Sequence, residues 1–212
     1  MLPRELDPIE VRVLGSLLEK EQTTPEYYPL TINALLAACN QKSNREPVLE
    51  LSEADVRGAI GRLRDEMLVW ESSGARVVRY EHTLDRRLEL DAQAKALLTV
   101  LFLRGPQTPG ELRSRTERMC AFASLPEVEA VLRRMAGAPA PLVAELPRRP
   151  GQKETRWAHL AAGTPEDVLV GALPPTVTGE AAALAERVAE LEARLAELTA
   201  TFERLLVKLG ER

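Results

Sequence analysis

Two stretches of the chain repeat one pattern: residues 13–25 read VLGSLLEKEQTTP and residues 97–109 read LLTVLFLRGPQTP. In each stretch the first apolar residues recur at i, i+1, i+4 and i+5, which places them on one face of a helix. Each stretch ends in a Thr-Pro pair, in which a threonine hydroxyl can cap a helix and proline fills a position that needs no amide donor. The sequence therefore predicts, twice, an amphipathic helix followed by the start of a second helix.

The correspondence continues along both copies. Ser52 and Val56 match Ser124 and Val128, and the strand-like run at 68–71 matches the run at 142–145. The first copy carries extra polar residues, CNQKSNREP at 39–47. The pattern predicts helices over 8–20, 31–38 and 52–67 with strands over 68–71 and 77–82, and then helices over 91–103, 109–116 and 124–136 with strands over 142–146 and 155–160.

Three helices closed by a β-hairpin within about 80 residues is the winged-helix form of the helix-turn-helix. We therefore expect a mainly α protein with small β-hairpins, of the α+β class. It would contain two tandem winged-helix domains followed by a C-terminal coiled-coil helix. The expected boundaries are 1–88 and 89–162 for the two domains, 163–178 for a linker and 179–210 for the coiled coil.

Two long motifs also identify a family. Residues 18–48, LEKEQTTPEYYPLTINALLAACNQKSNREPV, and residues 97–119, LLTVLFLRGPQTPGELRSRTERM, closely resemble the YceH family of bacterial proteins. The resemblance covers nearly the whole chain, including the C-terminal helix. It implies a tandem winged-helix fold and no established activity, so it brings no catalytic residues to this chain.

The C-terminal segment has a heptad pattern typical of a coiled coil. Its apolar positions are spaced alternately by four and three residues, and leucine occupies every d position. We expect this helix to form a homodimer; the alternative is that it packs back on its own winged-helix domains. The residues of the seam are Leu184, Val188, Leu191, Leu195, Leu198, Phe202, Leu205 and Leu209.

Charge is unevenly distributed along the chain. The 28 basic and 32 acidic residues give a net charge of −4, which excludes nucleic-acid binding by bulk attraction alone. Residues 1–88 contain 12 basic and 15 acidic residues, residues 89–162 contain 11 and 8, and residues 163–212 contain 5 and 9. The basic charge is therefore concentrated in the second repeat.

A winged helix contacts DNA through its third helix and its wing. In the second repeat, cations flank the predicted third helix, surround the helix before it and bracket the wing turn. We expect them to contact phosphates, the alternative being a solvated basic surface. These candidate DNA-binding residues are Arg113, Arg115, Arg118, Arg133, Arg134, Arg148, Arg149 and Lys153.

Two features of the first repeat allow more than one interpretation. The loop at 40–46 adds Lys42 and Arg45 as candidate DNA contacts, although its Asn and Ser residues are equally typical of a structural turn. The outer face of the third helix consists of Ala54, Gly58, Gly61 and Asp65. Such small residues favour close approach by another protein over base recognition.

No phosphate-binding glycine loop, nucleophile elbow or paired metal-ligand spacing is found. Cys39, Cys120, His82 and His159 are isolated in the sequence, so we expect no metal, no cofactor and no enzymatic activity. The start MLPRELDPIE lacks an apolar signal segment, and no run approaches a membrane span, which predicts a cytoplasmic protein with no membrane contact. The favoured function is a dimeric DNA-binding regulator; the alternative is a protein-interaction scaffold that uses the first repeat.

Overall fold

A computed structural model describes residues 2–72, 77–148 and 154–164, together with the single residues 187 and 194. By its contacts, Met1–Gly171 forms one compact unit and Ala172–Arg212 a second one. In the second unit Arg187 and Arg194 are helical. All eight residues of the predicted heptad seam lie outside the described residues, so the coiled coil stays a prediction.

The first half of the compact unit contains four helices and a small antiparallel sheet. Its helices are α1 (Pro8–Thr23), α2 (Ile32–Cys39), α3 (Glu53–Asp65) and α4 (Leu84–Leu88), with a single 3-10 turn at Pro25–Tyr27. Its strands are β1 (Leu30–Thr31), β2 (Val69–Ser72) and β3 (Arg79–His82), in the order β1-β3-β2. The sequence did not predict β1 or α4.

The second half repeats three helices and a hairpin, and in its described residues a single antiparallel bridge between Gln107 and Trp157 takes the place of the β1–β3 pairing. Its helices are α5 (Ala92–Arg104), α6 (Pro109–Thr116) and α7 (Leu125–Ala136). Its strands β4 (Val143–Leu146) and β5 (Arg156–His159) pair antiparallel, with Val143 opposite His159 and Leu146 opposite Arg156. The chain is thus a helical protein with small antiparallel sheets, as expected.

The helix starts follow from side-chain caps. Asp7, Ser52 and Thr108 each form a capping box with the acidic residue three positions later, at the starts of α1, α3 and α6. The role expected for Thr24-Pro25 was wrong, because Thr24 makes no side-chain cap and the pair opens only the 3-10 turn. Pro29 follows too closely for a helix to continue, and α2 begins later with Thr31 as its cap.

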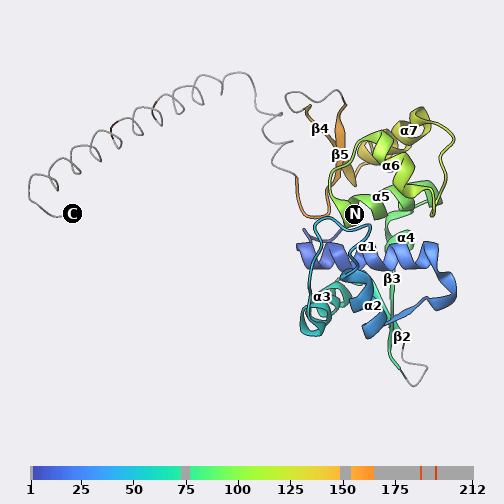
Figure 1. Ribbon diagram of the computed structural model, residues 1–212, viewed down its shortest axis with the longest axis vertical. Coiled ribbons are helices and arrows are strands. Elements are labelled where there is room, and N and C mark those ends of the chain that lie inside the picture. The colour runs from blue at the N-terminus through green and yellow to red at the C-terminus, as the bar shows by residue number, and fades with distance from the viewer. Residues whose placement is uncertain (1, 73–76, 149–153, 165–186, 188–193, 195–212) are drawn as a thin grey trace, which may run out of the picture. The chain divides into compact units, whose positions relative to one another are not determined.

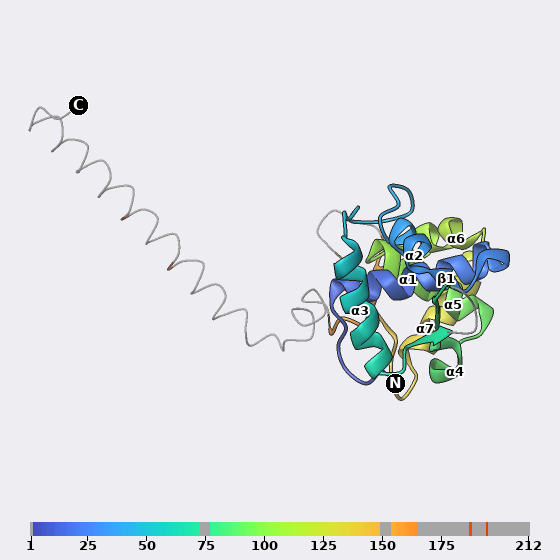
Figure 2. The ribbon, with the colours of Figure 1, turned by 90° about the horizontal axis from the view of Figure 1, so that it is seen from below.

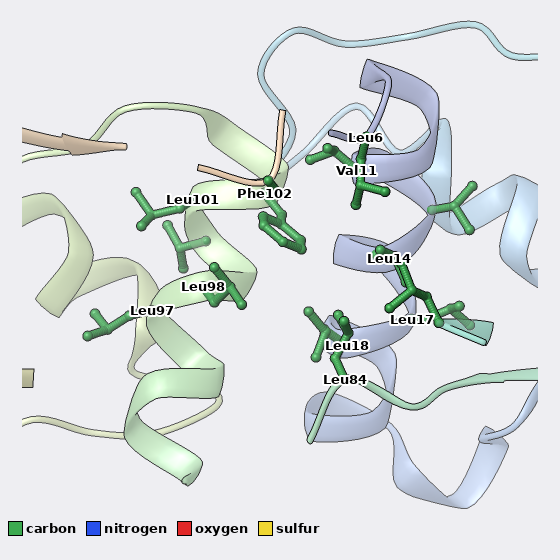
Figure 3. Close-up of a cluster of buried hydrophobic side chains, with 14 of the residues drawn as sticks. Leu6, Val11, Leu14, Leu17, Leu18, Leu84, Leu97, Leu98, Leu101 and Phe102 are labelled. Carbon is green, nitrogen blue, oxygen red and sulfur yellow. The ribbon is translucent and has the colours of Figure 1, made fainter. Parts of the chain in front are cut away.

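The two halves share one hydrophobic core. Figure 1 shows α1 between α2 and α3 on one side and α5 on the other, and Figure 2 shows α1 against both α2 and α5 from below. In Figure 3, Leu14 and Leu18 of α1 face Leu98 and Phe102 of α5. The boundary expected after residue 88 therefore lies within a continuous core.

Backbone hydrogen bonds also join the halves. The amide of Leu6, before α1, donates to the carbonyl of Ala161, after β5, at 2.7 Å. The amide of Glu46 donates to the carbonyl of Leu103 at the end of α5, at 2.8 Å. These bonds fix the N-terminal segment and the loop after α2 against the second half. No described helix is long and apolar enough to cross a bilayer.

Candidate nucleic-acid interface

The helix α7 turns an apolar face inward and a charged face outward. Val128, Leu132 and Met135 are buried, whereas Arg133 and Arg134 have side chains that are 69% and 57% exposed. Arg133 pairs with Glu129 one turn earlier at 2.7 Å, and Arg134 pairs with Asp91, the cap of α5. Both arginines thus lie on the surface, in exposed ion pairs.

The arginines of and after α6 have different surroundings. Arg113 donates to the carbonyl oxygens of Phe122 and Ala123, at 3.3 and 3.2 Å, and so shapes the turn between α6 and α7. Arg115 pairs with Glu111 at 3.3 Å and is 29% exposed. Arg118, 63% exposed, lies 3.7 Å from Glu19 of α1. Of these three, Arg113 and Arg118 are exposed and Arg115 is partly buried.

The β4–β5 hairpin contributes less that can be described. Arg148 follows β4 and is exposed, while Arg149 and Lys153 lie outside the described residues. Thr155 donates to Glu145 at 2.6 Å across the hairpin. Of the three cations expected at the wing turn, the structure therefore describes Arg148 alone.

In the loop after α2, Lys42 is exposed but Arg45 is buried. The guanidinium of Arg45 pairs with Glu19 at 2.6 Å and donates to the carbonyl of Ala38 at 2.9 and 3.1 Å. Its side chain has no exposed surface. The structure therefore removes Arg45 from the candidate DNA contacts and supports the interpretation of this loop as a structural turn.

A second buried arginine donates hydrogen bonds to the backbone at both ends of the same loop. Arg12 of α1, itself 3% exposed, donates to the carbonyls of Cys39 and Pro47 at 2.9 and 2.6 Å. Asn40 adds a reciprocal pair with the backbone of Leu51, at 2.8 and 2.9 Å. The polar residues of this loop thus satisfy backbone groups, which is what turn residues commonly do.

The exposed ion pairs of Arg133 and Arg134 are weak enough for these arginines to change partners. Each exposed pair contributes only about 0.2–1 kcal/mol, and a guanidinium has more donors than one carboxylate uses. Phosphates can therefore replace Glu129 or Asp91 as partners of Arg133 and Arg134 at small cost. Chemically, this surface can bind an anionic backbone.

The outer face of α3 matches the sequence analysis. Ala54, Gly58, Gly61 and Asp65 are all exposed. The flanking arginines are taken up by carboxylates: Arg57 by Glu53 at 2.7 Å, Arg62 by Asp7 at 2.6 Å, and Arg64 by Glu71. This helix thus presents small residues between neutralised charges.

Sequence reasoning missed a cavity of about 750 Å³ near the start of α6. Arg104 and Arg156 line it, together with Glu46, Glu111 and Glu154. Its two cations face three carboxylates, so it does not extend the basic surface. The signal for Arg104 was its position directly before the Gly105-Pro106 helix stop, where a cation suits the end of a helix.

His82 is not isolated in space, contrary to its isolation in the sequence. Its Nε2 lies 3.1 Å from Glu21 and its Nδ1 lies 3.3 Å from Asp85. These three residues have the spacing of metal ligands, but the ammonium of Lys95 donates to Glu21 at 2.7 Å and to Asp85 at 2.6 Å. Lys95 thus supplies the positive charge that a metal ion would bring.

The pKa shifts of Glu21 and Lys95 are those expected for an ion pair between the two halves. Hydrogen bonds from His82 and Lys95 lower the pKa of Glu21 to about 2, although burial alone would raise it. Burial opposes the charged form of Lys95, but hydrogen bonds to Asp85 and Glu21 leave its pKa raised. Glu21 and His82 belong to the first half and Lys95 to α5, so the cluster joins the two halves.

Fold and surface together define the class of protein: a helical protein with small antiparallel sheets, two halves on one core, and exposed arginines on the second half. Residues 6–152 match the model of a family described as "Protein of unknown function, DUF480". The chain is 49% identical over 209 residues to a UPF0502 protein of Albidiferax ferrireducens. The matched residues cover 97% of this chain and 91% of that protein. It is 49% identical over 199 residues to a UPF0502 protein of Dechloromonas aromatica, with 92% and 93% covered. The chain therefore belongs to the DUF480 (UPF0502) family of uncharacterised bacterial proteins, which confirms the family resemblance found in the sequence.

Proposed function

We propose that this protein is a dimeric, cytoplasmic DNA-binding regulator and not an enzyme, built from two winged helices, with the second half as the main DNA contact. In a winged helix the third helix enters the major groove. By its place in the repeat, α7 is that helix in the second half, and α3 is its counterpart in the first.

The observation that carries the proposal is the pair of exposed arginines on the outer face of α7. Within the described residues Arg133 and Arg134 pair with exposed carboxylates, so a phosphate can take their place. Arg118 and Arg148 add exposed cations on the same half. The excess of 11 basic over 8 acidic residues in 89–162 supports the same half as the DNA contact.

Dimerisation rests on the heptad pattern of 184–209. Two copies would present two α7 helices, which suits a two-fold symmetric DNA site. Light scattering at micromolar concentration should give the mass of a dimer, and Leu191→Asp with Leu198→Asp should lower the dimer fraction because charges enter the seam. A wild-type monomer would contradict the dimer.

Titration of the purified protein against a labelled random-sequence duplex, by fluorescence anisotropy at several salt concentrations, tests DNA binding. If four cations contact phosphates, the logarithm of the binding constant should fall against the logarithm of salt with a slope of roughly −3.6. Absence of binding even at about 50 mM salt would contradict the proposal.

A second candidate is a protein-interaction scaffold that uses the first half. It is favoured by the exposed apolar side chains near the β2–β3 hairpin: Met67 is 69% exposed, Trp70 63% and Val77 53%. Met67 and Trp70 line one hollow, and exposed apolar residues that lie together are typical of protein contacts. A protein that fails to bind DNA but retains a partner through this surface would support the scaffold.

A further inference from the structure

The strand β2 has an open edge. In the order β1-β3-β2 only one side of β2 is covered by β3. The amide of Thr83 donates to the carbonyl of Leu68 at 3.0 Å, and the amide of His82 donates away from β2, to the Tyr28 hydroxyl, at 2.7 Å. Because hydrogen-bonded pairs alternate along an antiparallel ladder, Trp70 pairs with Glu81 through the backbone.

The same alternation turns the amides and carbonyls of Val69 and Glu71 away from β3. Within the described residues no backbone or side-chain group bonds these four atoms. An edge strand with free amides and carbonyls is a template for another strand. The edge of β2 is therefore competent to pair.

The surroundings of this edge leave room for a partner. A hollow of about 360 Å³ lies beside it, lined by Gly61, Arg64 and Asp65 of α3 and by Met67 and Trp70. Trp70 stands on the outer face of the sheet and is 63% exposed. Glu71, the charged side chain of the strand, is already paired with Arg64. A second strand would thus meet an apolar side chain, and the charged side chain of β2 itself is already paired.

We propose that the β2 strands of two copies of this chain pair antiparallel, with the two-fold axis at Trp70. In this register Val69 of each copy lies opposite Glu71 of the other, and the two pairs exchange four backbone hydrogen bonds. The two Trp70 residues then form a non-hydrogen-bonded pair, with Cα atoms about 4.5 Å apart, where aromatic pairs stabilise a sheet.

The two-fold axis is placed at Trp70 because this register sets the two exposed tryptophans opposite each other. Centring the pair on Glu71 would place two glutamates directly opposite each other, which is unfavourable. A foreign charged peptide finds no consistent charge to bind, because Arg64 lies beside Asp65 and Glu71 at the hollow. A second copy supplies an edge whose charged side chain, Glu71, is already paired, and a matching tryptophan.

Disulfide trapping of Trp70→Cys tests the proposal, in full-length protein that carries Cys120→Ser. The Cα separation at a non-hydrogen-bonded pair lies in the range that a disulfide spans. With oxidised glutathione, this variant should form a covalent dimer on a non-reducing gel. Glu81→Cys is the matched control, because Glu81 lies beside Trp70 on the same face but on the covered strand β3. Equal trapping of both variants would overturn the proposal.

Glu71→Pro, added to the Trp70→Cys chain, tests the backbone bonds directly. The nitrogen of Glu71 faces the open edge, so proline leaves the β2–β3 ladder intact. Loss of the two symmetric bonds should lower the trapped fraction roughly tenfold. Unchanged trapping would overturn the register. Hydrogen exchange at the amides of Val69 and Glu71 gives a second readout. Fast exchange at every protein concentration would overturn self-pairing and leave the edge to a different protein.

Discussion

Gly15 of α1 lies directly against Leu103 at the end of α5. A Cβ placed on Gly15 would stand 2.9 Å from Cδ2 of Leu103 and 3.0 Å from Cβ of Phe102. Real Cβ atoms do not approach so closely. The absence of a side chain at Gly15 therefore lets the first helices of the two repeats join into one core.

Gly15→Ala should destabilise the protein by about 1 kcal/mol in urea unfolding, because the cost of overpacking exceeds the gain in helix propensity. Gly61→Ala on α3 is the matched control: nothing lies within 4 Å of its added Cβ, so it should stabilise by up to about 1 kcal/mol. Both variants should unfold in one transition, since both halves share the core. Equal stabilisation by the two alanines would contradict this packing.

Arg45→Met should cost about 3–5 kcal/mol of unfolding free energy. The substitution leaves the buried Glu19 without its closest partner, and the penalty of an unpaired buried charge is large. Lys42→Met, three residues away on the exposed side of the same loop, should stay within about 0.5 kcal/mol. A similar small loss for both would show that Arg45 is not the structural residue of the loop.

His159 makes stability depend on pH. Burial lowers its pKa to about 4, and its Nδ1 has no hydrogen-bond partner among the described residues. Its ring packs edge-on against Phe102, with the ring centroids 5.0 Å apart. Between pH 6.5 and 4 the unfolded chain binds a proton that the folded protein does not. Stability is therefore complete above about pH 6.5 and should fall by up to about 1.4 kcal/mol per pH unit toward pH 4.

Urea midpoints at pH 7.5, 6 and 5 measure this effect. His159→Leu should flatten the profile over that range, whatever it does to stability at pH 7.5. The low pKa of Glu21, about 2, acts in a separate window below pH 4.5, where protonation removes its stabilising contacts. A wild-type profile that is flat between pH 6.5 and 5 would show that His159 titrates equally in both states.

Local pattern predicted most of the helices and both hairpins. Ser52 and Thr108 mark helix starts because a capping box needs only residues three apart. The sequence did not predict β1 and α4, because elements of two and five residues are too short to show a periodic pattern. The apolar positions of α1 and α5 predicted buried faces, but they could not reveal that the two helices bury those faces against each other.

The candidate site was predicted less well, for a similar reason. Exposure of Arg133 follows from its position on α7, opposite the apolar residues. Burial of Arg45 depends on Glu19, 26 residues earlier, and spacing of that kind has no pattern. The available signal was Glu19 itself, because a carboxylate in the buried stretch of α1 requires a partner.

The salt dependence of DNA binding by Arg133→Ala with Arg134→Ala tests the central claim most directly. If these arginines contact phosphates, the double variant should bind more weakly, and its slope of log binding constant against log salt should become shallower by roughly 1.8. Arg57→Ala with Arg64→Ala on α3, with side chains 53% and 50% exposed, is the matched control and should leave the slope unchanged. Equal slopes for the wild type and the α7 double variant would contradict DNA binding through this helix.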